Sequence, residues 1–542
     1  MKLTEESLQR KEAWERAGIR VPEFDRKAMR AETRRHPIWL HFGSGSLFRA
    51  FHAPLQQVLL ERGLVKGGVY VAETFDMEML EASYLPCDHL SILVTLLPEG
   101  APEKTIIGSI AGAFRCDPVF SADYEELKAI FRCPSLQLVT FTITEKGYAL
   151  TGLDGGFSPQ AEADYVSGPH RGRLAMSKAA SLLLERYQAG GAPLAMVSTD
   201  NCSHNGEKLR RGVVTMAEQW RKRGLVEAGF PEWLSDEAKV SFPWTMIDKI
   251  TPRPAESVAR ALAASGIEGM EITVTGKGGY TAPFVNAEKP QYLVIEDRFP
   301  NGRPPLEQAG VYFTDRDTVN AVEKMKVTTC LNPLHTALAV FGCLLGYHSI
   351  SDEMADPLLK ALVEKIGYTE GMPVVTDPGI IRPQEFIREV IDRRLPNPFL
   401  PDTPQRIAMD TSQKLPIRFG ETLKSYAATD GLDVTALTYI PLTIAGWLRY
   451  LLAVDDSGIP FQCSSDPLLP ELQLQLASVK PGVPESAAPE TLAPILSNPM
   501  LFGVDLTAVG LSEKVIGMLR EMLTGPGAIR RTLEHYLNVT VI

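Results

Sequence analysis

Lysine, asparagine and histidine lie close together in the stretch KMKVTTCLNPLHTALAVFGCLLGY, which begins at Lys324. Asn332 and His335 are three positions apart, so a helix starting here would present both on one face, one turn apart. A lysine can act as a general base, and amide and imidazole groups can hold a developing alkoxide. These residue types could therefore carry acid–base chemistry on an oxygen of a substrate. The alternative is a set of ordinary polar residues at the start of a buried helix.

A glycine turn follows the first predicted strand. The stretch PIWLHFGSGS (37–46) is typical of a buried strand, and it runs through Gly43 and Gly45 into a helix. Such a turn lets backbone N–H groups approach a pyrophosphate, and the helix N-terminus adds a favourable dipole. Phe48 occupies the position of the third glycine in the usual pattern. The turn predicts a dinucleotide site, with a tight connection as the alternative.

Two acids near the end of the second predicted strand bear on the choice of cofactor. Glu73 and Asp76 lie 28 and 31 residues beyond Gly45. An acid at this strand end commonly accepts hydrogen bonds from the adenosine ribose, which favours NAD over NADP. The usual spacing is about 20 residues, so both acids remain candidates, and a solvated strand end is the alternative.

The composition excludes several other classes of protein. The 542 residues are 44% apolar and 22% charged, with a net charge of -11, which argues against a general nucleic-acid or anionic-membrane binder. The chain shows no uncharged apolar run of about 18 residues and no signal-like N-terminus. Its seven scattered cysteines form no disulfide or zinc pattern. We therefore expect a cytoplasmic protein without a metal site.

Strands and helices alternate after an N-terminal arm (1–36), which predicts an α/β fold with a parallel sheet. The predicted strands are 37–46, 67–76, 90–98, 104–114, 136–148, 193–201, 270–276 and 291–299, and the predicted helices are 48–63, 123–131, 172–188 and 205–224. Helical periodicity dominates after about residue 315. We expect a Rossmann-type N-terminal domain with its arm (1–310) and a mostly α-helical C-terminal domain (311–542).

Several segments, in this order, resemble the mannitol dehydrogenase family of polyol-specific long-chain dehydrogenases. They are GSGSLFRAFH, TITEKGY (142–148), STDNCSHNGEKL (198–209), FPWTMIDKITPRP (242–254), LNPLHTALAVFGCLLGY and NPFLPDTPQRIAMDTSQKLPIR, and they span residues 41 to about 418. The resemblance implies a Rossmann-type domain followed by a helical one, with NAD(P) and no metal.

The resemblance also implies a lysine base, although its position is displaced here. The family spacing to Asn332 would put the lysine at Val327, whereas Lys326 lies one residue earlier and Lys324 three. A one-residue insertion such as a π-bulge would restore the geometry. We expect Lys326 to be the base, with Lys324 as the substitute, and two surface lysines as the alternative.

The remaining site residues follow from the same resemblance. Asn201, Asn332 and His335 would hold the reacting oxygen. Arg406 and Lys414 would grip the distal oxygens of the substrate, on one face if a continuous helix carries both. The cofactor-binding residues would be Gly43, Gly45, Phe48, Arg49, Glu73, Asp76, Thr144, Glu145 and Asp200.

The choice of substrate rests on whole-sequence resemblance. We expect NAD-dependent interconversion of D-fructuronate and D-mannonate, with NADP less favoured as cofactor. Mannitol 2-dehydrogenase and tagaturonate reductase are the alternatives, and a non-catalytic dinucleotide-binding protein is the alternative from a different class. The expected partner is a small sugar acid or polyol, with no nucleic acid or membrane. The sequence leaves the oligomeric state, the substrate stereochemistry and the physiological direction open.

Overall fold

The computed structural model describes residues 1–152 and 155–538. The chain folds into two compact units, Met1–Val319 and Asn320–Ile542. The boundary between them falls inside helix α11 (Arg316–Met325). The first unit begins with the short helices α1 (Lys11–Arg16) and α2 (Arg26–Arg35), which form the N-terminal arm.

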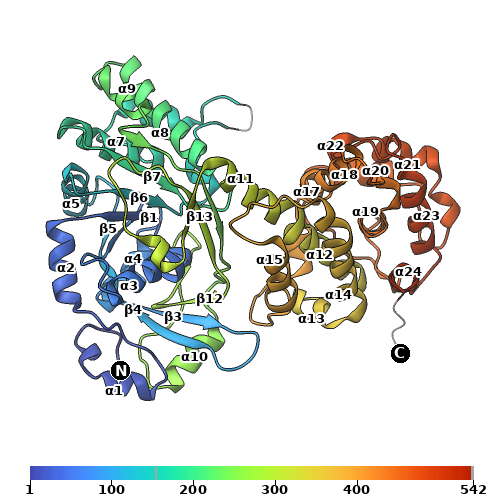
Figure 1. Ribbon diagram of the computed structural model, residues 1–542, viewed down its shortest axis with the longest axis horizontal. Coiled ribbons are helices and arrows are strands. Elements are labelled where there is room, and N and C mark those ends of the chain that lie inside the picture. The colour runs from blue at the N-terminus through green and yellow to red at the C-terminus, as the bar shows by residue number, and fades with distance from the viewer. Residues whose placement is uncertain (153–154, 539–542) are drawn as a thin grey trace. The chain divides into compact units, whose positions relative to one another are not determined.

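The main sheet of the first unit contains, within the described residues, six parallel strands in the order β5-β2-β1-β6-β7-β8 (Figure 1). The strands are β1 (Trp39–Phe42), β2 (Val69–Glu73), β5 (Ile110–Arg115), β6 (Leu138–Phe141), β7 (Leu194–Ser198) and β8 (Val240–Ser241). Counted along the chain within this sheet, the order is 3-2-1-4-5-6, which is the Rossmann arrangement. The expected Rossmann-type fold is therefore confirmed.

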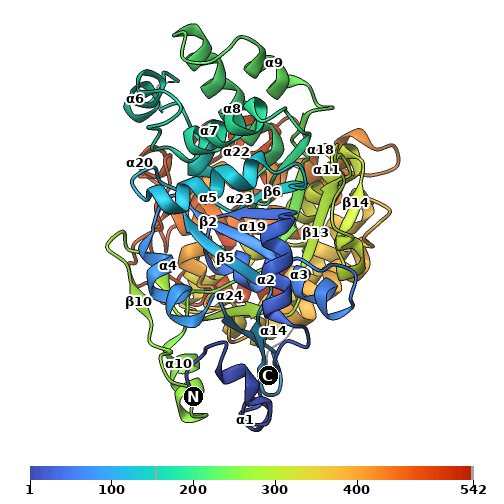
Figure 2. The same cartoon turned by 90° about the vertical axis from the view of Figure 1, so that its left-hand side faces the viewer.

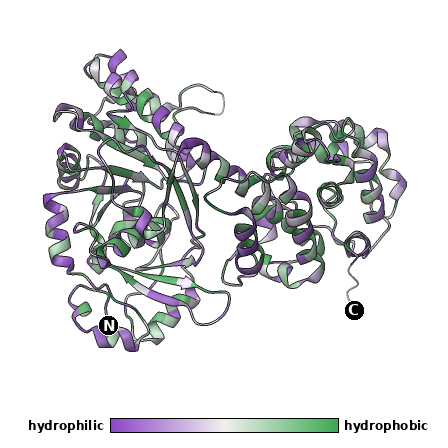
Figure 3. Cartoon of the chain, viewed as in Figure 1, coloured by the Kyte–Doolittle hydropathy of each residue, from purple (hydrophilic) through white to green (hydrophobic). Residues whose placement is uncertain are grey.

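Side chains that alternate along the strands fill two cores, one on each face of the sheet. Leu40 and Phe42 of β1 belong to the core that includes residues of α5 (Ser121–Arg132), α7 (Ala175–Gln188) and α8 (Asn205–Lys222). Trp39 belongs to the other core, with α3 (Ala53–Glu61) and two strands of a smaller sheet. Because both faces are covered, the strands are almost wholly apolar. Figure 3 shows hydrophobic strands in the middle of this unit and a largely hydrophilic α2 at its edge.

Smaller sheets account for most of the differences from the predicted strands. The predicted strand 104–114 is two strands, because β4 (Glu103–Ile107) pairs antiparallel with β3 (Ser91–Leu96) whereas β5 joins the main sheet. The predicted strand 270–276 contributes only β10 (Thr273–Val274), which forms a hairpin with β11 (Tyr280–Thr281). The other strands are β9 (Thr245–Asp248), β12 (Phe284–Glu288), β13 (Tyr292–Glu296) and β14 (Tyr312–Thr314), in the sheets β12-β3-β4 and β14-β13-β9. Figure 2 shows the same unit from the side of α2 and α5.

The second unit is helical, as predicted. Its helices are α12 (Asn332–Leu345), α13 (Ile350–Ala355), α14 (Pro357–Glu364), α15 (Pro383–Glu389), α16 (Pro404–Ile407), α17 (Thr411–Arg418), α18 (Gly420–Ala428), α19 (Tyr439–Leu451), α20 (Leu469–Gln475), α21 (Pro489–Leu496), α22 (Pro499–Phe502), α23 (Ser512–Met522) and α24 (Ala528–Leu537). The continuous helical stretch Arg316–Leu345 is long and apolar enough to cross a membrane, but its apolar window is 83% buried inside the protein. Most of this apolar stretch is therefore packed inside the protein.

A buried carboxyl group lies in this helical core. Glu353 on α13 is fully buried, and no described residue donates a hydrogen bond to either of its carboxyl oxygens. It packs against Gly342, where a Cβ would lie only 1.9 Å from its Oε1. Burial, with a smaller effect of Asp352, raises the pKa of Glu353 to about 9. The carboxyl group is thus neutral at pH 7.

We expect Glu353→Gln to stabilise the protein increasingly as pH rises. The unfolded pKa is 4.5 and the folded pKa is about 9, so the folded state of the natural protein loses stability between these values. The loss is up to about 1.4 kcal/mol per pH unit. Urea unfolding at pH 5.5 and pH 8.5 measures it. The stability difference between the variant and the natural protein should widen by about 2 to 4 kcal/mol over this range.

The exposed Glu385 provides a matched control, because it is 59% exposed and pairs with Arg382 at the surface. Glu385→Gln should leave the pH dependence of unfolding unchanged. A constant stability difference between Glu353→Gln and the natural protein at both pH values would show that Glu353 is already ionised at neutral pH.

Candidate active site

The glycine turn lies between β1 and a helical stretch that consists of the π-helix Phe48–His52 and α3. Gly43 has a φ of 108°, and a Cβ on it would lie 2.2 Å from the carbonyl oxygen of Thr142. A Cβ on Gly45 would meet nothing within 4 Å. The close approach of the neighbouring strand end therefore requires glycine at position 43, whereas the space beside Gly45 is open to a ligand.

Backbone donors at the start of this helix are available to an anion. In the described part of the chain, the N–H groups of Gly45, Ser46 and Leu47 make no hydrogen bond. Such N–H groups and the helix dipole together favour a phosphate at a helix N-terminus. The turn therefore fits the pyrophosphate of a dinucleotide.

Glu73 holds the glycine turn in place. Its Oε2 accepts hydrogen bonds from the N–H and the hydroxyl of Ser44, at 2.9 and 2.6 Å. Its Oε1 accepts from the N–H groups of the three residues that follow it, at 2.9 to 3.2 Å. The hydroxyl of Tyr84 completes the arrangement by donating to the carbonyl oxygen of Ser44, at 2.7 Å. Five donors occupy the acceptor sites of one carboxylate, which leaves Glu73 no capacity for ribose hydroxyls.

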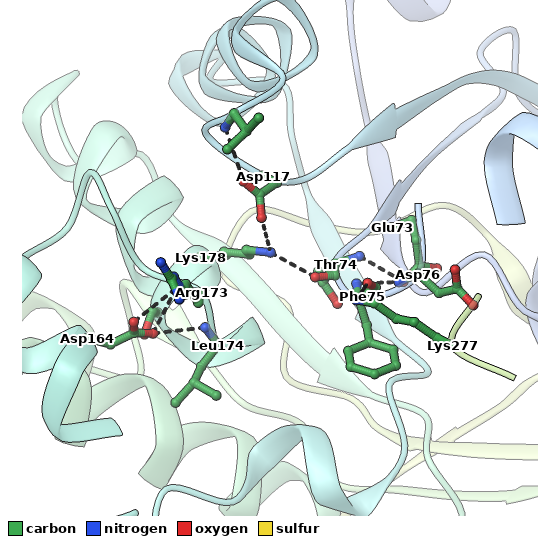
Figure 4. A network of polar contacts seen from close by, with 12 residues as sticks. Glu73, Thr74, Phe75, Asp76, Asp117, Asp164, Arg173, Leu174, Lys178 and Lys277 are labelled. Atoms are coloured by element: carbon green, nitrogen blue, oxygen red, sulfur yellow. Dashed lines mark hydrogen bonds and ion pairs between the residues drawn. The ribbon is translucent and has the colours of Figure 1, made fainter. Parts of the chain in front are cut away.

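Asp76 keeps one open acceptor at the same strand end. Its Oδ2 accepts a hydrogen bond from the hydroxyl of Thr275, at 2.6 Å. No residue within the described ranges donates to its Oδ1. Of the two acids that the sequence left as alternatives, Asp76 is thus the one that can accept a hydrogen bond from a ligand. Figure 4 shows Glu73, the last residue of β2, and Asp76 on the loop that follows it.

A buried lysine fixes the loop between these acids. Lys178 of α7 donates to the carbonyl oxygen of Thr74 at 2.8 Å and to Asp117 at 3.1 Å (Figure 4). Asp117 follows β5, so one ammonium group joins the carboxyl ends of two neighbouring strands. Sequence reasoning missed Lys178 because helical periodicity gives no sign that a lysine in α7 reaches this loop.

Phe48 and Arg49 differ from what the sequence predicts. Both side chains are fully buried. The guanidinium of Arg49 donates to the carbonyl oxygen of Ala282 at 2.6 Å and to the hydroxyl of Thr281 at 3.3 Å. This burial argues against direct contact of either side chain with a cofactor, and it makes both residues supports of the turn.

The ends of β6 and β7 are joined through Asp200. Its carboxylate accepts from the N–H groups of Ile143 and Thr144 and from the hydroxyl of Tyr148, at 2.5 to 3.0 Å. Burial raises the pKa of Asp200, and these three donors oppose that effect. Thr144 has a φ of 63°, an unusual conformation for a residue other than glycine. Asp200 therefore shapes the loop and compensates for local strain.

Two other predicted residues lie beside this loop. Asn201 is exposed directly after Asp200, at the carboxyl end of β7. Glu145 is largely exposed, with 64% of its side chain accessible, and pairs with Lys208 at 2.5 Å. The carboxyl ends of β1, β2, β6 and β7 thus carry all the predicted cofactor residues, and ligands of Rossmann folds bind at this edge.

In the second unit, Lys326 begins a π-helix, Lys326–Cys330, between α11 and α12. The N–H of Leu331 donates to the carbonyl oxygen of Lys326 at 3.1 Å, the five-residue bond of a π-turn. The expected insertion is therefore present. Lys326 is buried with 3% exposure. Because Lys326 is buried, the alternative of two surface lysines is wrong for Lys326. Lys324, in contrast, is half exposed and lies 4.0 Å from Glu421.

Asn332 and His335 begin α12. Nε2 of His335 lies 3.6 Å from Oδ2 of Asp402, and no described residue forms a hydrogen bond with it. Burial lowers the pKa of His335 to about 4, opposed by Asp402 and assisted by Arg418, Arg406 and Arg394. The imidazole is therefore neutral at physiological pH, so one ring nitrogen can donate and the other accept.

The sequence spacing allows one continuous helix to carry both Arg406 and Lys414, but in the structure the two residues lie on different helices. Asp410 adopts a φ of 52° and separates α16, which carries Arg406, from α17, which carries Lys414. Arg406 pairs with Asp402, and the ammonium of Lys414 donates to the carbonyl oxygens of Ile407 and Met409. Burial and the nearby Arg418 lower the pKa of Lys414.

Two cations and one acid of this region were missed by the sequence reasoning. Arg418 donates to the hydroxyl of Thr336 at 2.6 Å, and burial lowers its pKa to about 10. Arg394 is 3% exposed and acts electrostatically on His335. Asp402 lies beside the same imidazole. Asp402 and Arg418 both lie in the segment NPFLPDTPQRIAMDTSQKLPIR, which resembles the family and ends at Arg418. That resemblance was the sequence signal that could have identified these two residues.

The first unit has a Rossmann sheet with an open glycine turn. The helical unit that follows carries lysine, asparagine and histidine on adjoining turns. This combination defines a two-domain dehydrogenase. The mannitol dehydrogenase Rossmann domain matches residues 37–308, and the mannitol dehydrogenase C-terminal domain matches residues 318–521. The chain belongs to the mannitol dehydrogenase family and is an oxidoreductase.

Individual relatives agree with this assignment. The chain is 54% identical to the D-mannonate oxidoreductase of Thermotoga maritima, with 98% of each chain covered. It is 29% identical to a polyol:NADP oxidoreductase of Gluconobacter oxydans, covering 85% of this chain and 88% of the relative. The crystal structure of mannitol 2-dehydrogenase from Pseudomonas fluorescens, a ternary complex with NAD and D-mannitol, matches with a TM-score of 0.69 and 25% identity over all of both chains.

Proposed function

We propose that this protein is an NAD-dependent oxidoreductase that interconverts D-fructuronate and D-mannonate. The observation that carries the proposal is a set of cations: Arg394, Arg406 and Arg418 act electrostatically on His335, and Lys414 lies near Arg406 and Arg418. Both proposed substrates carry a carboxylate, which guanidinium and ammonium groups bind strongly. Neutral polyols and ketoses can accept hydrogen bonds from these cations through their hydroxyl groups, but they carry no opposite charge to pair with them. The 54% identity to a D-mannonate oxidoreductase supports the same choice.

Lys326 is the proposed general base. In the oxidative direction its amine takes the proton of the substrate hydroxyl, and in the reductive direction it returns that proton to the carbonyl oxygen. Asn332, His335 and Asn201 are proposed to hold the same oxygen while its charge changes. A neutral His335 suits this role because it can donate one hydrogen bond without competing for the proton that Lys326 takes.

Arg406 and Lys414 are proposed to position the substrate through its distal oxygens. Their charges do not change during the reaction, so they contribute mainly to binding and orientation. The guanidinium of Arg406 has the fork geometry that matches a carboxylate. Over half of its side chain is exposed, at 56%, so the group is accessible to a ligand.

The proposed cofactor is NAD, held at the carboxyl edge of the Rossmann sheet. A bound nicotinamide would supply the hydride acceptor or donor. The N–H groups that begin the helix after Gly45 would bind the pyrophosphate, and Asp76 would accept from the adenosine ribose. A carboxylate at this position disfavours the 2′-phosphate of NADP. The relative named as a polyol:NADP oxidoreductase keeps NADP as the second candidate.

Two other substrate assignments belong to the same family. Mannitol 2-dehydrogenase is the first alternative, favoured by the fold match to the complex with D-mannitol. Tagaturonate reductase is the second, because its substrate also carries a carboxylate. A dinucleotide-binding protein without turnover is the alternative from a different class. The buried position of Lys326 on a π-helix favours a catalytic protein over that alternative.

The proposal includes the setting in which the enzyme acts. We infer a cytoplasmic enzyme whose partner is a small molecule, consistent with its acidic composition and its seven free cysteines. The reaction is proposed to proceed without a metal ion, as the family resemblance implies.

A substrate panel tests the function. Fructuronate, tagaturonate, fructose, mannonate and mannitol are each assayed with NAD(H) and NADP(H). We expect kcat/KM for fructuronate with NADH to exceed that for fructose by at least about 10³-fold, since a paired carboxylate contributes several kcal/mol of binding. A preference for mannitol and fructose would identify the first alternative. Dinucleotide binding without turnover of any of these substrates would favour the non-catalytic class.

A further inference from the structure

A hairpin outside the Rossmann sheet contacts the loop that follows β2. The hairpin consists of β10 and β11 with the intervening residues 275–279. The hydroxyl of Thr275 donates to Asp76, and the N–H of Gly276 donates to Glu78 at 2.8 Å. The ammonium of Lys277 donates to the carbonyl oxygen of Phe75 and lies 4.0 Å from the centre of its ring (Figure 4). Three successive hairpin residues therefore hold two residues of the loop and the first residue of the helix that follows it, α4 (Glu78–Ser83).

The other end of the hairpin contacts the helix that follows the glycine turn. Arg49 donates to Thr281 and Ala282, and the hydroxyls of Ser83 and Thr281 lie 2.8 Å apart. Arg49 is fully buried, so these bonds are shielded from water. One hairpin thus joins the segment that would bind the pyrophosphate to the segment that would bind the ribose.

The contact with Thr275 determines which oxygen of Asp76 a ligand can reach. Thr275 occupies Oδ2, and no described residue donates to Oδ1. Gly279 makes room for this arrangement, because a Cβ there would lie 2.8 Å from Oδ2 of Asp76 and 3.0 Å from the hydroxyl oxygen of Thr275. The hairpin therefore sets the direction of the free oxygen, as a buried partner does for a ligating carboxylate.

The loop also presents an aromatic ring. Phe75 is 67% exposed, and Lys277 lies over its ring. A planar apolar ring next to an acid that can accept from hydroxyl groups matches an adenosine, whose base stacks and whose ribose donates hydrogen bonds. The ammonium of Lys277 restrains Phe75 at two points, the carbonyl oxygen of Phe75 and the aromatic ring of Phe75.

We propose that the hairpin 273–281 is a cofactor-selectivity element of this enzyme. Thr275 is a positioning residue that directs Asp76 at the adenosine ribose, and Lys277 is a positioning residue that holds Phe75 beside the adenine. The inference rests on the proposed function, because it takes the dinucleotide to be the ligand. It adds to that function a group of residues about 200 positions distant from the acid they orient.

Direct binding measurements test the hairpin without substrate. Dissociation constants for NADH and NADPH are measured by nucleotide fluorescence for the natural protein and for Thr275→Val, Thr275→Ser, Gly279→Ala and Lys277→Ala. We expect Thr275→Val and Gly279→Ala to lower the preference for NADH over NADPH by about tenfold, because the direction of Asp76 is lost. Thr275→Ser keeps the hydroxyl and should retain the natural preference. Lys277→Ala should weaken both nucleotides about equally.

Controls separate this inference from the proposed function. Lys289→Ala changes an exposed lysine of the same unit that pairs with Glu103 away from the loop, and it should bind as the natural protein does. Natural protein that binds neither nucleotide, or prefers NADPH, overturns the NAD assignment and the inference with it. Natural protein that prefers NADH, with the same preference in folded Thr275→Val and Gly279→Ala, overturns the hairpin inference alone. Loss of the preference in Thr275→Ser as well would also overturn the role of the hydroxyl.

Discussion

Lys326→Ala should lower kcat for fructuronate reduction by about 10³-fold or more while NADH binds with an unchanged dissociation constant. Removal of a general acid–base group costs on the order of 10²- to 10⁴-fold. Lys326 lies in the helical unit, on the π-helix that precedes α12, and the glycine turn belongs to the other unit. Steady-state rates and NADH fluorescence titration measure the two quantities separately.

Lys324 provides the matched control for this experiment. It stands two residues earlier and is half exposed, with its ammonium 4.0 Å from Glu421. Lys324→Ala should keep kcat within about threefold of the natural value, as expected for a surface ion pair of small energy. The opposite result, a large loss in Lys324→Ala and activity retained in Lys326→Ala, would transfer the role of base to Lys324.

Arg406→Ala should raise KM for fructuronate by about 30- to 100-fold with a smaller change in kcat. A hydrogen bond to a charged group contributes about 2 to 3 kcal/mol, and a positioning contact made in both ground state and transition state appears mainly in KM. The exposed guanidinium of Arg406 pairs only with Asp402 among the described residues. Initial rates over a range of fructuronate concentrations at saturating NADH measure the effect.

A surface arginine and a neutral substrate sharpen this test. Arg382 is 81% exposed and pairs with Glu385, so Arg382→Ala should leave KM unchanged. Fructose lacks the carboxylate, so any residual activity toward it should respond much less to Arg406→Ala than the activity toward fructuronate does. An equal rise in KM for both substrates would mean that Arg406 contacts hydroxyl groups common to both.

Local patterns in the sequence account for the architecture. The main-sheet strands β1, β2, β6 and β7 are short apolar runs, and helical periodicity directly follows β1 and β7, so this part of the alternation is visible without tertiary information. The glycine turn and the Lys–Asn–His stretch are also local, because each lies within about a dozen residues. The displaced lysine even predicts the π-helix, since one extra residue must be accommodated before Asn332.

The predictions that failed depend on contacts between distant residues. Residues 104–114 look like one strand, but their first half belongs to the sheet of β3 and their second half belongs to the main sheet. The spacing of Arg406 and Lys414 permits one helix, yet the left-handed conformation of Asp410 ends it. Arg49 lies inside the family pattern for the cofactor turn, but its side chain is buried against Ala282, 233 residues away.

The sequence by itself determined the class of this protein: a Rossmann unit with a dinucleotide turn, a helical unit, and a lysine, an asparagine and a histidine on adjoining turns. The division into two units follows from periodicity, and the class follows from the resemblance of the ordered segments to one family. Only the tertiary structure distinguishes the hydrogen-bond capacity of the two acids, because Glu73 accepts from Ser44, 29 residues away, and Asp76 accepts from Thr275, 199 residues away. Hydrogen-bond capacity and burial depend on such distant partners, and local sequence carries no record of them.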